Sequence, residues 1–506
     1  MVAPASSGAA ESPNAGLGAL QQLARAEVAY YQSQLPAGTV VNCIAPAGNP
    51  AFGTPAWTLR DLENELCATG RLQDEYTNPA FNAALLSETP AIYSSQLLAQ
   101  LGRPGHLEGG VTSLVPGATT ADPFRTLARW TSAGLGRVTP VSFRASDGAV
   151  LRGYVFEPPA HDPPPPSGYP GVTITDGSLQ GFQQMYFWAA EGLAQDGYMV
   201  MTYDVQGEGE SDLLPSNCLQ GLLSSHSCPG VPFQQNYNFY QGAEDSLNFF
   251  LSSATSPYEG SSNPDAASLN DNDIALAGHS LGAAAVSEVG QCDKRVKTIV
   301  AWDDLTTVAN CNGVDIPPAD RSPTLLHAPA LALTNDYFLN PEPMTSVPNA
   351  HAKDAGYRQL VSAGLNAEEV AIRGTTHLTY TYTYIPYALP AGSLAERVAF
   401  YYTQAWLNYE MRWQPSALQE LTAKTFDASA DVASIGAGTF DAAKALADPT
   451  NLTADNVPYD IAGLPVANLV SIYYESEYSL QNFTSGVEQS CSDMRADCPA
   501  VAPPTP

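Results

Sequence analysis

Short apolar runs alternate with amphipathic stretches from about residue 138 onward, and this alternation limits the possible folds more than any other feature of the chain. The runs GVTITDG, YMVMTYD and DIALAGHS are followed by QMYFWAAEGLAQDG, YQGAEDSLNFFLSS and LGAAAVSEVG, which have helical spacing. Strands that are apolar throughout are typical of a parallel sheet covered by helices on both faces. The pattern therefore predicts an α/β fold with a mostly parallel sheet.

The length of 506 residues favours one large domain that carries extensions. Residues 1–125 have helical patterning and predict an N-terminal helical extension. Residues 126–412 hold the alternating pattern and open with a predicted hairpin around the turn Ser146-Asp147-Gly148. Residues 413–506 are rich in Ala, Asp and Thr and predict a C-terminal accessory or lid-like segment.

The chain is strongly acidic, with 21 Lys and Arg against 51 Asp and Glu and a formal net charge of −30. Such a surface repels phosphate backbones and anionic lipids, so nucleic acid and membrane surfaces are poor candidates for partners. No apolar run approaches the roughly 18 residues that a membrane-spanning helix needs. We therefore expect no membrane span and no nucleic-acid partner.

Eight cysteines fall into four couples that are close in sequence, none of them a C-x-x-C motif. The spacing favours four disulfides in an oxidising compartment over a zinc site, with eight reduced thiols in a cytosolic enzyme as the alternative. The start, MVAPASSGAAESPNAG, has neither a basic nor an apolar signal region, and we expect it to follow a signal peptide that has been removed. The chain is therefore predicted to be secreted. The predicted pairs are Cys43 with Cys67, Cys218 with Cys228, Cys292 with Cys311, and Cys491 with Cys498.

The motif Gly278-His279-Ser280-Leu281-Gly282 follows an apolar strand and precedes a run of small, helix-forming residues. This strand-turn-helix setting is that of a nucleophile elbow, in which a serine sits on a sharp, strained turn. The two glycines let neighbouring segments approach closely, and the helix start behind the serine stabilises negative charge. Ser280 is the predicted nucleophile.

A serine nucleophile needs a base within hydrogen-bond reach, and in this type of site the base comes late in the chain. His377 follows the apolar strand EEVAIRG, at the carboxyl edge where the sites of open α/β sheets gather. His377 is therefore the predicted base, with His351 as the alternative.

The acid that orients the base belongs between the serine and the histidine in chain order. Asp336 ends the run PALALTND and is our predicted acid. Asp303 and Asp304, which end VKTIVAWDD one strand earlier, are the alternative.

An oxyanion needs two hydrogen-bond donors. One is predicted to be the backbone N–H of Leu281, the residue after the nucleophile. The other is predicted in the glycine-containing loop after GVTIT, where Ser178 is preferred and Leu179 is the alternative.

The chain resembles the esterase and lipase branch of the α/β-hydrolase superfamily, including polyester hydrolases, cutinase-like enzymes and relatives of dienelactone hydrolase. The residues that carry this resemblance lie between about 140 and 410, in GVTITDGSLQGF, YFWAAEGLAQDGYMVMTYDVQGEGES, IALAGHSLGAAA, PALALTND and RGTTHL. The resemblance implies an α/β-hydrolase fold with Ser280, Asp336 and His377 as the triad. It implies Ser178 and Leu281 as the oxyanion-hole amides. Ser178 stands where polyester hydrolases commonly have an aromatic residue.

These observations predict a serine hydrolase that cleaves small-molecule or polymeric carboxylic esters, without metal or organic cofactor. A serine exopeptidase or amidase is the first alternative, because the same triad cleaves amides. A binding protein that retains the fold without activity is the second. The sequence predicts neither the oligomeric state nor the acyl chain and alcohol of the substrate.

Overall fold

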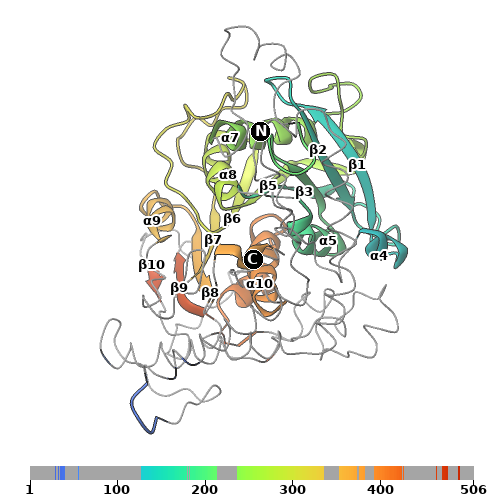
Figure 1. Cartoon of the computed structure of the whole chain (residues 1–506). Coiled ribbons are helices and arrows are strands. Elements are labelled where there is room, and N and C mark those ends of the chain that lie inside the picture. The colour runs from blue at the N-terminus through green and yellow to red at the C-terminus, as the bar shows by residue number, and fades with distance from the viewer. Residues whose placement is uncertain are drawn as a thin grey trace, which may run out of the picture.

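The computed structural model of the chain describes most of the predicted central domain (Figure 1). The described residues are 127–178, 183–212, 236–335, 353–372, 377–381, 393–423, 470–476 and 488–490, with a few shorter stretches and single positions besides. Almost all of the predicted N-terminal extension, residues 1–125, lies outside them.

The described strands form one ten-stranded sheet in the order β1-β2-β4-β3-β5-β6-β7-β8-β9-β10 (Figure 1). Between β4 and β8 in this order, each adjacent pair of strands is parallel. Antiparallel pairs stand at both ends of the sheet. The bounds are β1 (Arg137–Arg144), β2 (Val150–Glu157), β3 (Tyr169–Thr175), β4 (Met199–Asp204), β5 (Leu269–His279), β6 (Val296–Trp302), β7 (Ala330–Asn335), β8 (Ala367–Ile372), β9 (Val470–Ser476) and β10 (Glu488–Ser490).

Helices cover both faces of the sheet, as the alternating pattern predicts (Figure 1). Along β4, Val200 packs in a core with α5 and α10, whereas Met199 and Met201 pack in a second core with α7, α8 and α9. This side-to-side alternation explains why the central strands are apolar at almost every position. The bounds are α4 (Leu127–Ser132), α5 (Phe187–Gln195), α7 (Asn236–Phe250), α8 (Leu281–Cys292), α9 (Ala355–Ser362), α10 (Ser393–Glu410) and α11 (Pro415–Leu421), with short 3-10 helices η2 (Gln183–Tyr186), η3 (Ala266–Ser268) and η5 (His377–Tyr380).

The predicted α/β fold with a mostly parallel sheet is confirmed by this arrangement. The predicted hairpin is β1 and β2, which pair antiparallel with Arg144 opposite Val150. Gly148 in its turn has a φ of 97°, a conformation that glycine adopts at little cost.

Part of the predicted C-terminal segment, residues 413–506, belongs to the same sheet. Strand β9 pairs antiparallel with β8, and β10 pairs with β9. These two strands extend the sheet at the edge beyond β8, an arrangement that the composition of the segment did not indicate.

Cys292 and Cys311 form a disulfide, which confirms one of the four predicted pairs. Cys292 is the last residue of α8, so the bond fixes the end of this helix to the loop after β6. The cysteines of the other three predicted pairs lie outside the described residues; they are Cys43, Cys67, Cys218, Cys228, Cys491 and Cys498.

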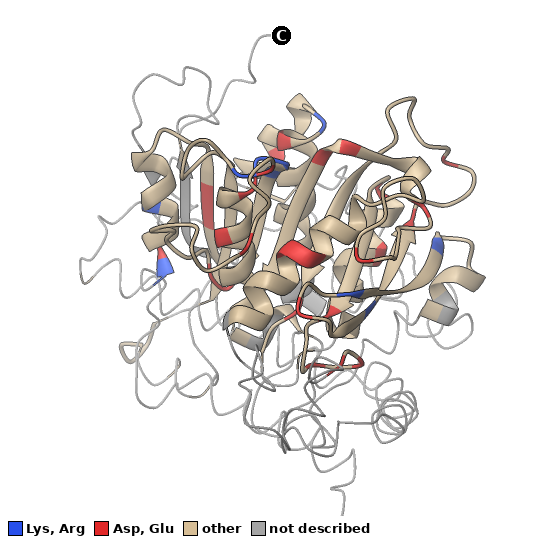
Figure 2. Cartoon of the chain, turned by 90° about the horizontal axis from the view of Figure 1, so that it is seen from above, with Lys and Arg blue, Asp and Glu red and all other residues tan. Residues whose placement is uncertain are grey.

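Acidic residues are spread over strands, helices and loops, and basic residues are sparse (Figure 2). Several of the basic side chains are held in ion pairs, such as Arg295 with Asp293 and Glu244. None of the helices in the described part of the chain is both long enough and apolar enough to cross a membrane.

Candidate active site

Ser280 stands on the sharp turn between β5 and α8, as the elbow motif predicts. Its backbone has φ 57° and ψ −122°, and its amide donates to the carbonyl oxygens of Trp302 at 3.0 Å and Asp303 at 3.2 Å. A Cβ on Gly278 would lie 2.5 Å from the carbonyl oxygen of Gly282. The turn is this tight because Gly278 and Gly282, each two residues from Ser280, lack side chains.

The imidazole of His377 lies beside the hydroxyl of Ser280. It is the first residue of η5, a few residues after β8 ends. Its Nε2 lies 2.7 Å from Ser280 Oγ, and its side chain is 12% exposed. The structure thus brings the predicted nucleophile and the predicted base within hydrogen-bond distance, with the base still open to solvent.

Among the described residues, the carboxylate bonded to His377 is that of Asp303, the alternative position in the sequence analysis. Asp303 Oδ2 lies 2.5 Å from His377 Nδ1, and the Asp303 side chain is fully buried. Asp303 directly follows β6, which is the neighbour of β5 in the sheet, whereas β7 is one strand further from Ser280. Asp336 lies just after the end of β7, outside the described residues.

Lys353 is a second partner of Asp303 that sequence reasoning missed. Its ammonium forms an ion pair with Asp303 Oδ1, so the two carboxylate oxygens have different partners. Burial alone would raise the pKa of Asp303, but the hydrogen bond from His377 and the charge of Lys353 together lower it below its usual value. Asp303 is therefore ionised and can accept the Nδ1 proton of His377. The run HAKDAG that contains Lys353 carried no signal for this role.

The predicted oxyanion loop lies directly against the elbow. Ser178 is half-buried in the loop after β3, and Leu281 is the half-buried first residue of α8. A Cβ on Gly177 would lie 3.2 Å from Ser280 Cβ, so this loop passes close to the nucleophile. The assignment of the Ser178 and Leu281 amides as donors stays a prediction, and the alternative, Leu179, lies outside the described residues.

His279, the variable residue of the elbow motif, also contacts the base. Its ring lies beside that of His377, with 4.7 Å between the ring centroids. Its Nε2 is 2.7 Å from the carbonyl oxygen of His377. The motif marks this position but does not indicate what its side chain does. The other candidate base, His351, lies outside the described residues.

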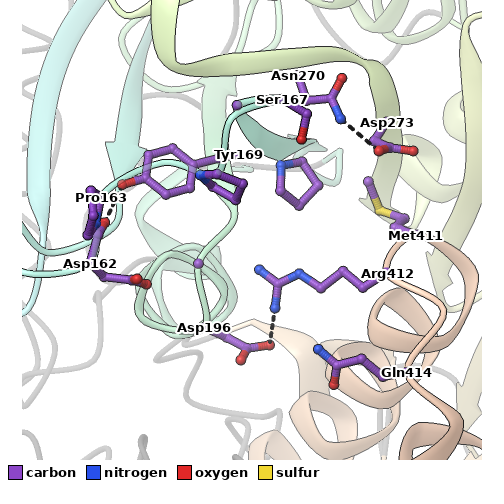
Figure 3. Close-up of a pocket in the computed structure, with 14 residues that line it drawn as sticks. Asp162, Pro163, Ser167, Tyr169, Asp196, Asn270, Asp273, Met411, Arg412 and Gln414 are labelled. Atoms are coloured by element: carbon purple, nitrogen blue, oxygen red, sulfur yellow. Dashed lines mark hydrogen bonds and ion pairs between the residues drawn. The ribbon is translucent and has the colours of Figure 1, made fainter.

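A pocket of about 430 Å³ lies at the opposite edge of the sheet, near the amino ends of β3 and β5 (Figure 3). Arg412 crosses it, paired with Asp196 at 3.6 Å and stacked 3.9 Å above the ring of Tyr198. The pocket is lined mainly by polar and proline residues, and its lining includes none of Ser280, His377 and Asp303. It therefore has no part in the chemistry of the triad.

The part of the chain that the structure describes contains no cluster of three or more His, Cys, Asp or Glu side chains placed to hold a metal ion. The chemistry available at the site is that of a serine hydroxyl, an imidazole and an ionised carboxylate in one hydrogen-bonded chain. Such a chain is suited to acyl transfer.

No family model matches the chain. It is 28% identical over 167 residues to Thiohydrolase apmlB of Arthrinium phaeospermum, a match that covers 33% of this chain and 43% of that protein. The chain thus spans less than half the length of this curated relative. A crystal structure of the hypothetical protein PA2218 from Pseudomonas aeruginosa matches at 15% identity with a TM-score of 0.25, over 33% of this chain and 42% of that one.

Proposed function

We propose that this chain is a serine hydrolase of the α/β-hydrolase fold that cleaves carboxylic esters through an acyl-enzyme at Ser280. The observation that carries the proposal is the hydrogen-bonded chain from Ser280 through His377 to Asp303. A serine hydroxyl is a weak nucleophile at neutral pH, and an oriented imidazole makes it reactive. Asp303 takes the role for which Asp336 was predicted.

The proposed reaction has two acyl transfers. In the first, His377 Nε2 accepts the proton of Ser280 as Oγ attacks the ester carbon, and then gives this proton to the departing alcohol. In the second, water gives a proton to His377 and attacks the acyl carbon, and Ser280 recovers the proton as the carboxylic acid leaves. Asp303 holds the imidazole in the correct tautomer and stabilises its protonated form. The amides of Leu281 and Ser178 are the proposed donors to the oxyanion.

Ser280→Ala tests the proposal directly, because it removes only the hydroxyl. Turnover of p-nitrophenyl acetate is expected to fall by roughly 10⁴-fold or more. A fluorophosphonate probe is expected to label the wild type and to leave the variant unlabelled. Activity of the variant within about tenfold of the wild type would contradict the proposal.

The same measurements separate the alternatives. A serine exopeptidase would prefer an aminoacyl anilide to the ester. A binding protein would neither turn over the ester nor react with the fluorophosphonate. A series of p-nitrophenyl esters of rising chain length, with a polyester film included, would define the acyl preference and test polymer cleavage.

Thioester cleavage is a second candidate, favoured by the similarity to a protein named a thiohydrolase. A thioester carbonyl is open to the same attack by Ser280. The leaving thiol depends less on a proton from His377 than an alcohol does, because a thiolate is a better leaving group than an alkoxide. Comparing kcat/KM for an acyl thioester and an oxygen ester with the same acyl group distinguishes the two. A preference of more than about a hundredfold for the thioester would replace the ester proposal.

We also propose that the protein works in an oxidising compartment, as expected of a secreted enzyme. The disulfide between Cys292 and Cys311 supports this, because such bonds persist where thiols are not kept reduced. Peptide mapping under non-reducing conditions is expected to recover the other three predicted pairs as well.

A further inference from the structure

His279 lies at the centre of a hydrogen-bond chain that the proposed reaction does not use. Its Nδ1 is 2.8 Å from Tyr186 Oη, and its Nε2 is 2.7 Å from the carbonyl oxygen of His377. The same Tyr186 oxygen lies 3.0 Å from the amide nitrogen of Gly177. The chain thus links the loop after β3 to the elbow and to the segment that carries the base.

When His279 is neutral, the protons of this hydrogen-bond chain can be arranged in only one way. A carbonyl oxygen only accepts, so His279 Nε2 carries a proton and donates it to His377. In a neutral ring, Nδ1 then accepts, and the Tyr186 hydroxyl donates to it. The hydroxyl oxygen in turn accepts from the amide of Gly177. Every donor in the chain therefore has an acceptor.

The charge state of both side chains agrees with this arrangement. Burial, followed by the charge of neighbouring His377, lowers the pKa of His279 to about 3. Burial also raises the pKa of Tyr186 well above its usual value, so its hydroxyl keeps its proton. His279 is 2% exposed and Tyr186 is 1% exposed, so water does not compete for these bonds.

We propose that His279 is a positioning residue, a neutral imidazole that fixes the backbone of His377 relative to Ser280. This inference rests on the proposed function and adds a residue to it. His279 is covalently attached to the nucleophile, so its bond to the carbonyl of His377 ties nucleophile and base together at a second point. The first point is the hydrogen bond between His377 Nε2 and Ser280 Oγ, which breaks and forms during the reaction.

Tyr186 extends the same support to the acid. Its ring stacks on Trp302, with 6.1 Å between centroids and 7° between the planes. Trp302 is the last residue of β6 and immediately precedes Asp303. The ring contact holds the Tyr186 hydroxyl in place against the strand that carries the acid.

The test compares the turnover of p-nitrophenyl acetate by His279→Leu and His279→Gln. The rates are expressed per active site, and the active sites are counted by fluorophosphonate titration. Leu removes the donor to His377, and kcat per active site is expected to fall by about 100-fold with KM within about threefold, because small misplacements of reacting groups cost this much. Gln keeps an N–H at the end of a side chain of similar length. The kcat of His279→Gln is therefore expected to be at least about tenfold higher than that of His279→Leu.

Tyr186→Phe provides an independent variant that removes one oxygen and keeps the ring. It leaves the amide of Gly177 and Nδ1 of His279 without their partner, and kcat is expected to fall by about tenfold. The effects of substituting two residues of one hydrogen-bond chain do not add up. The double variant Tyr186→Phe with His279→Leu is therefore expected to lose little more than His279→Leu alone.

A merely structural role predicts a different outcome. The melting temperature and the fraction of titratable sites would fall, while kcat per titrated site would stay within about threefold of the wild type in all four variants. That result, with Ser280→Ala inactive, overturns the role of His279 and leaves the proposed function standing. If Ser280→Ala itself keeps its activity, the proposed function fails and this inference fails with it. If His279→Leu does not fold, His279→Gln and Tyr186→Phe decide between the same outcomes.

Discussion

At the scale of single residues, the site depends on backbone conformations that residues with side chains rarely adopt. Ser280 has a φ of 57° and Asp303 a φ of 46°. Such conformations cost about 1–3 kcal/mol each and persist only where the surroundings hold them. Here the amide of Ser280 donates to the carbonyl oxygens of Trp302 and Asp303. The nucleophile and the acid are thus joined through the backbone as well as through His377.

The identity of the acid is testable at this scale. Asp303→Asn should place the wrong tautomer of His377 next to Ser280, and kcat is expected to fall on the order of 10⁴-fold. Asp304→Asn is the matched control, because Asp304 is the next residue and the bond to His377 belongs to Asp303; it is expected to stay within about tenfold. A mild Asp303→Asn together with a severe Asp336→Asn would restore the acid predicted from the sequence.

Lys353 should affect the pH dependence of the reaction. Its ammonium pairs with the carboxylate that faces His377, and its positive charge helps to lower the pKa of Asp303. In Lys353→Met this charge is lost and Asp303 binds a proton at higher pH, so the pH below which kcat/KM declines is expected to move upward by about half a unit or more. Lys353→Arg keeps the charge and should keep the profile of the wild type. Identical profiles for all three proteins would contradict this role.

At the scale of elements, the site depends on how closely α8 approaches β3. The helix begins directly at the nucleophile, and a Cβ on Gly282 would lie 2.2 Å from the carbonyl oxygen of Asp176 and 2.5 Å from that of Thr175. Both oxygens belong to the end of β3 and the start of the oxyanion loop. The absence of a side chain at Gly282 therefore sets the distance between the nucleophile and that loop.

Gly282→Ala should separate these two elements. Because the obstacle is backbone, the helix must shift, and we expect a loss of about 2 kcal/mol or more in stability together with at least a tenfold loss of ester turnover. Gly242→Ala in α7 is the control, since its added Cβ would have its nearest neighbour at 3.8 Å. That variant should be neutral or slightly more stable, because alanine favours helix over glycine. Equal effects in thermal unfolding would argue against the close approach.

At the scale of the whole molecule, the fold buries carboxyl groups in an already anionic chain. Glu369 on β8 is fully buried, and within the described residues neither of its carboxylate oxygens has a hydrogen-bond partner. Burial, and then the charges of Asp354 and Asp304, raise its pKa well above the usual value. Asp204 is also buried, and burial raises its pKa to about 7. These groups bind protons more tightly in the folded than in the unfolded state.

Stability should therefore depend on pH in a defined direction. A carboxyl whose pKa is raised on folding contributes stability below its unfolded pKa, and this contribution is lost as the pH rises through the folded pKa. The free energy of unfolding is expected to fall between about pH 4, the usual pKa of a carboxyl group, and about pH 7, the folded pKa of Asp204. Glu369→Gln, which is neutral throughout, should reduce this fall, because a glutamine has no proton to release on unfolding. Glu259→Gln at an exposed position should leave it unchanged, and equal slopes in chemical denaturation would contradict the prediction.

The sequence by itself determined those features that depend on neighbours along the chain. Apolar runs without alternation predicted buried parallel strands, because a strand covered on both faces has no solvent side. Gly278 and Gly282 predicted a tight elbow around Ser280, because segments on both sides of the turn can approach closely only where these two positions lack side chains. The position of His377 just after a strand placed it at the carboxyl edge of the sheet.

Only the tertiary structure decided which carboxylate reaches His377. Asp303 and Asp336 both follow strands that end at this edge, and no local pattern separates them. The bonded pair lies 74 residues apart, and its distance follows from the order of β5, β6 and β7 across the sheet. The partnerships of Lys353 with Asp303 and of His279 with His377 are long-range in the same way. Hydrogen bonds between distant segments require a geometry that exists only once the sheet and the loops at its edge are assembled.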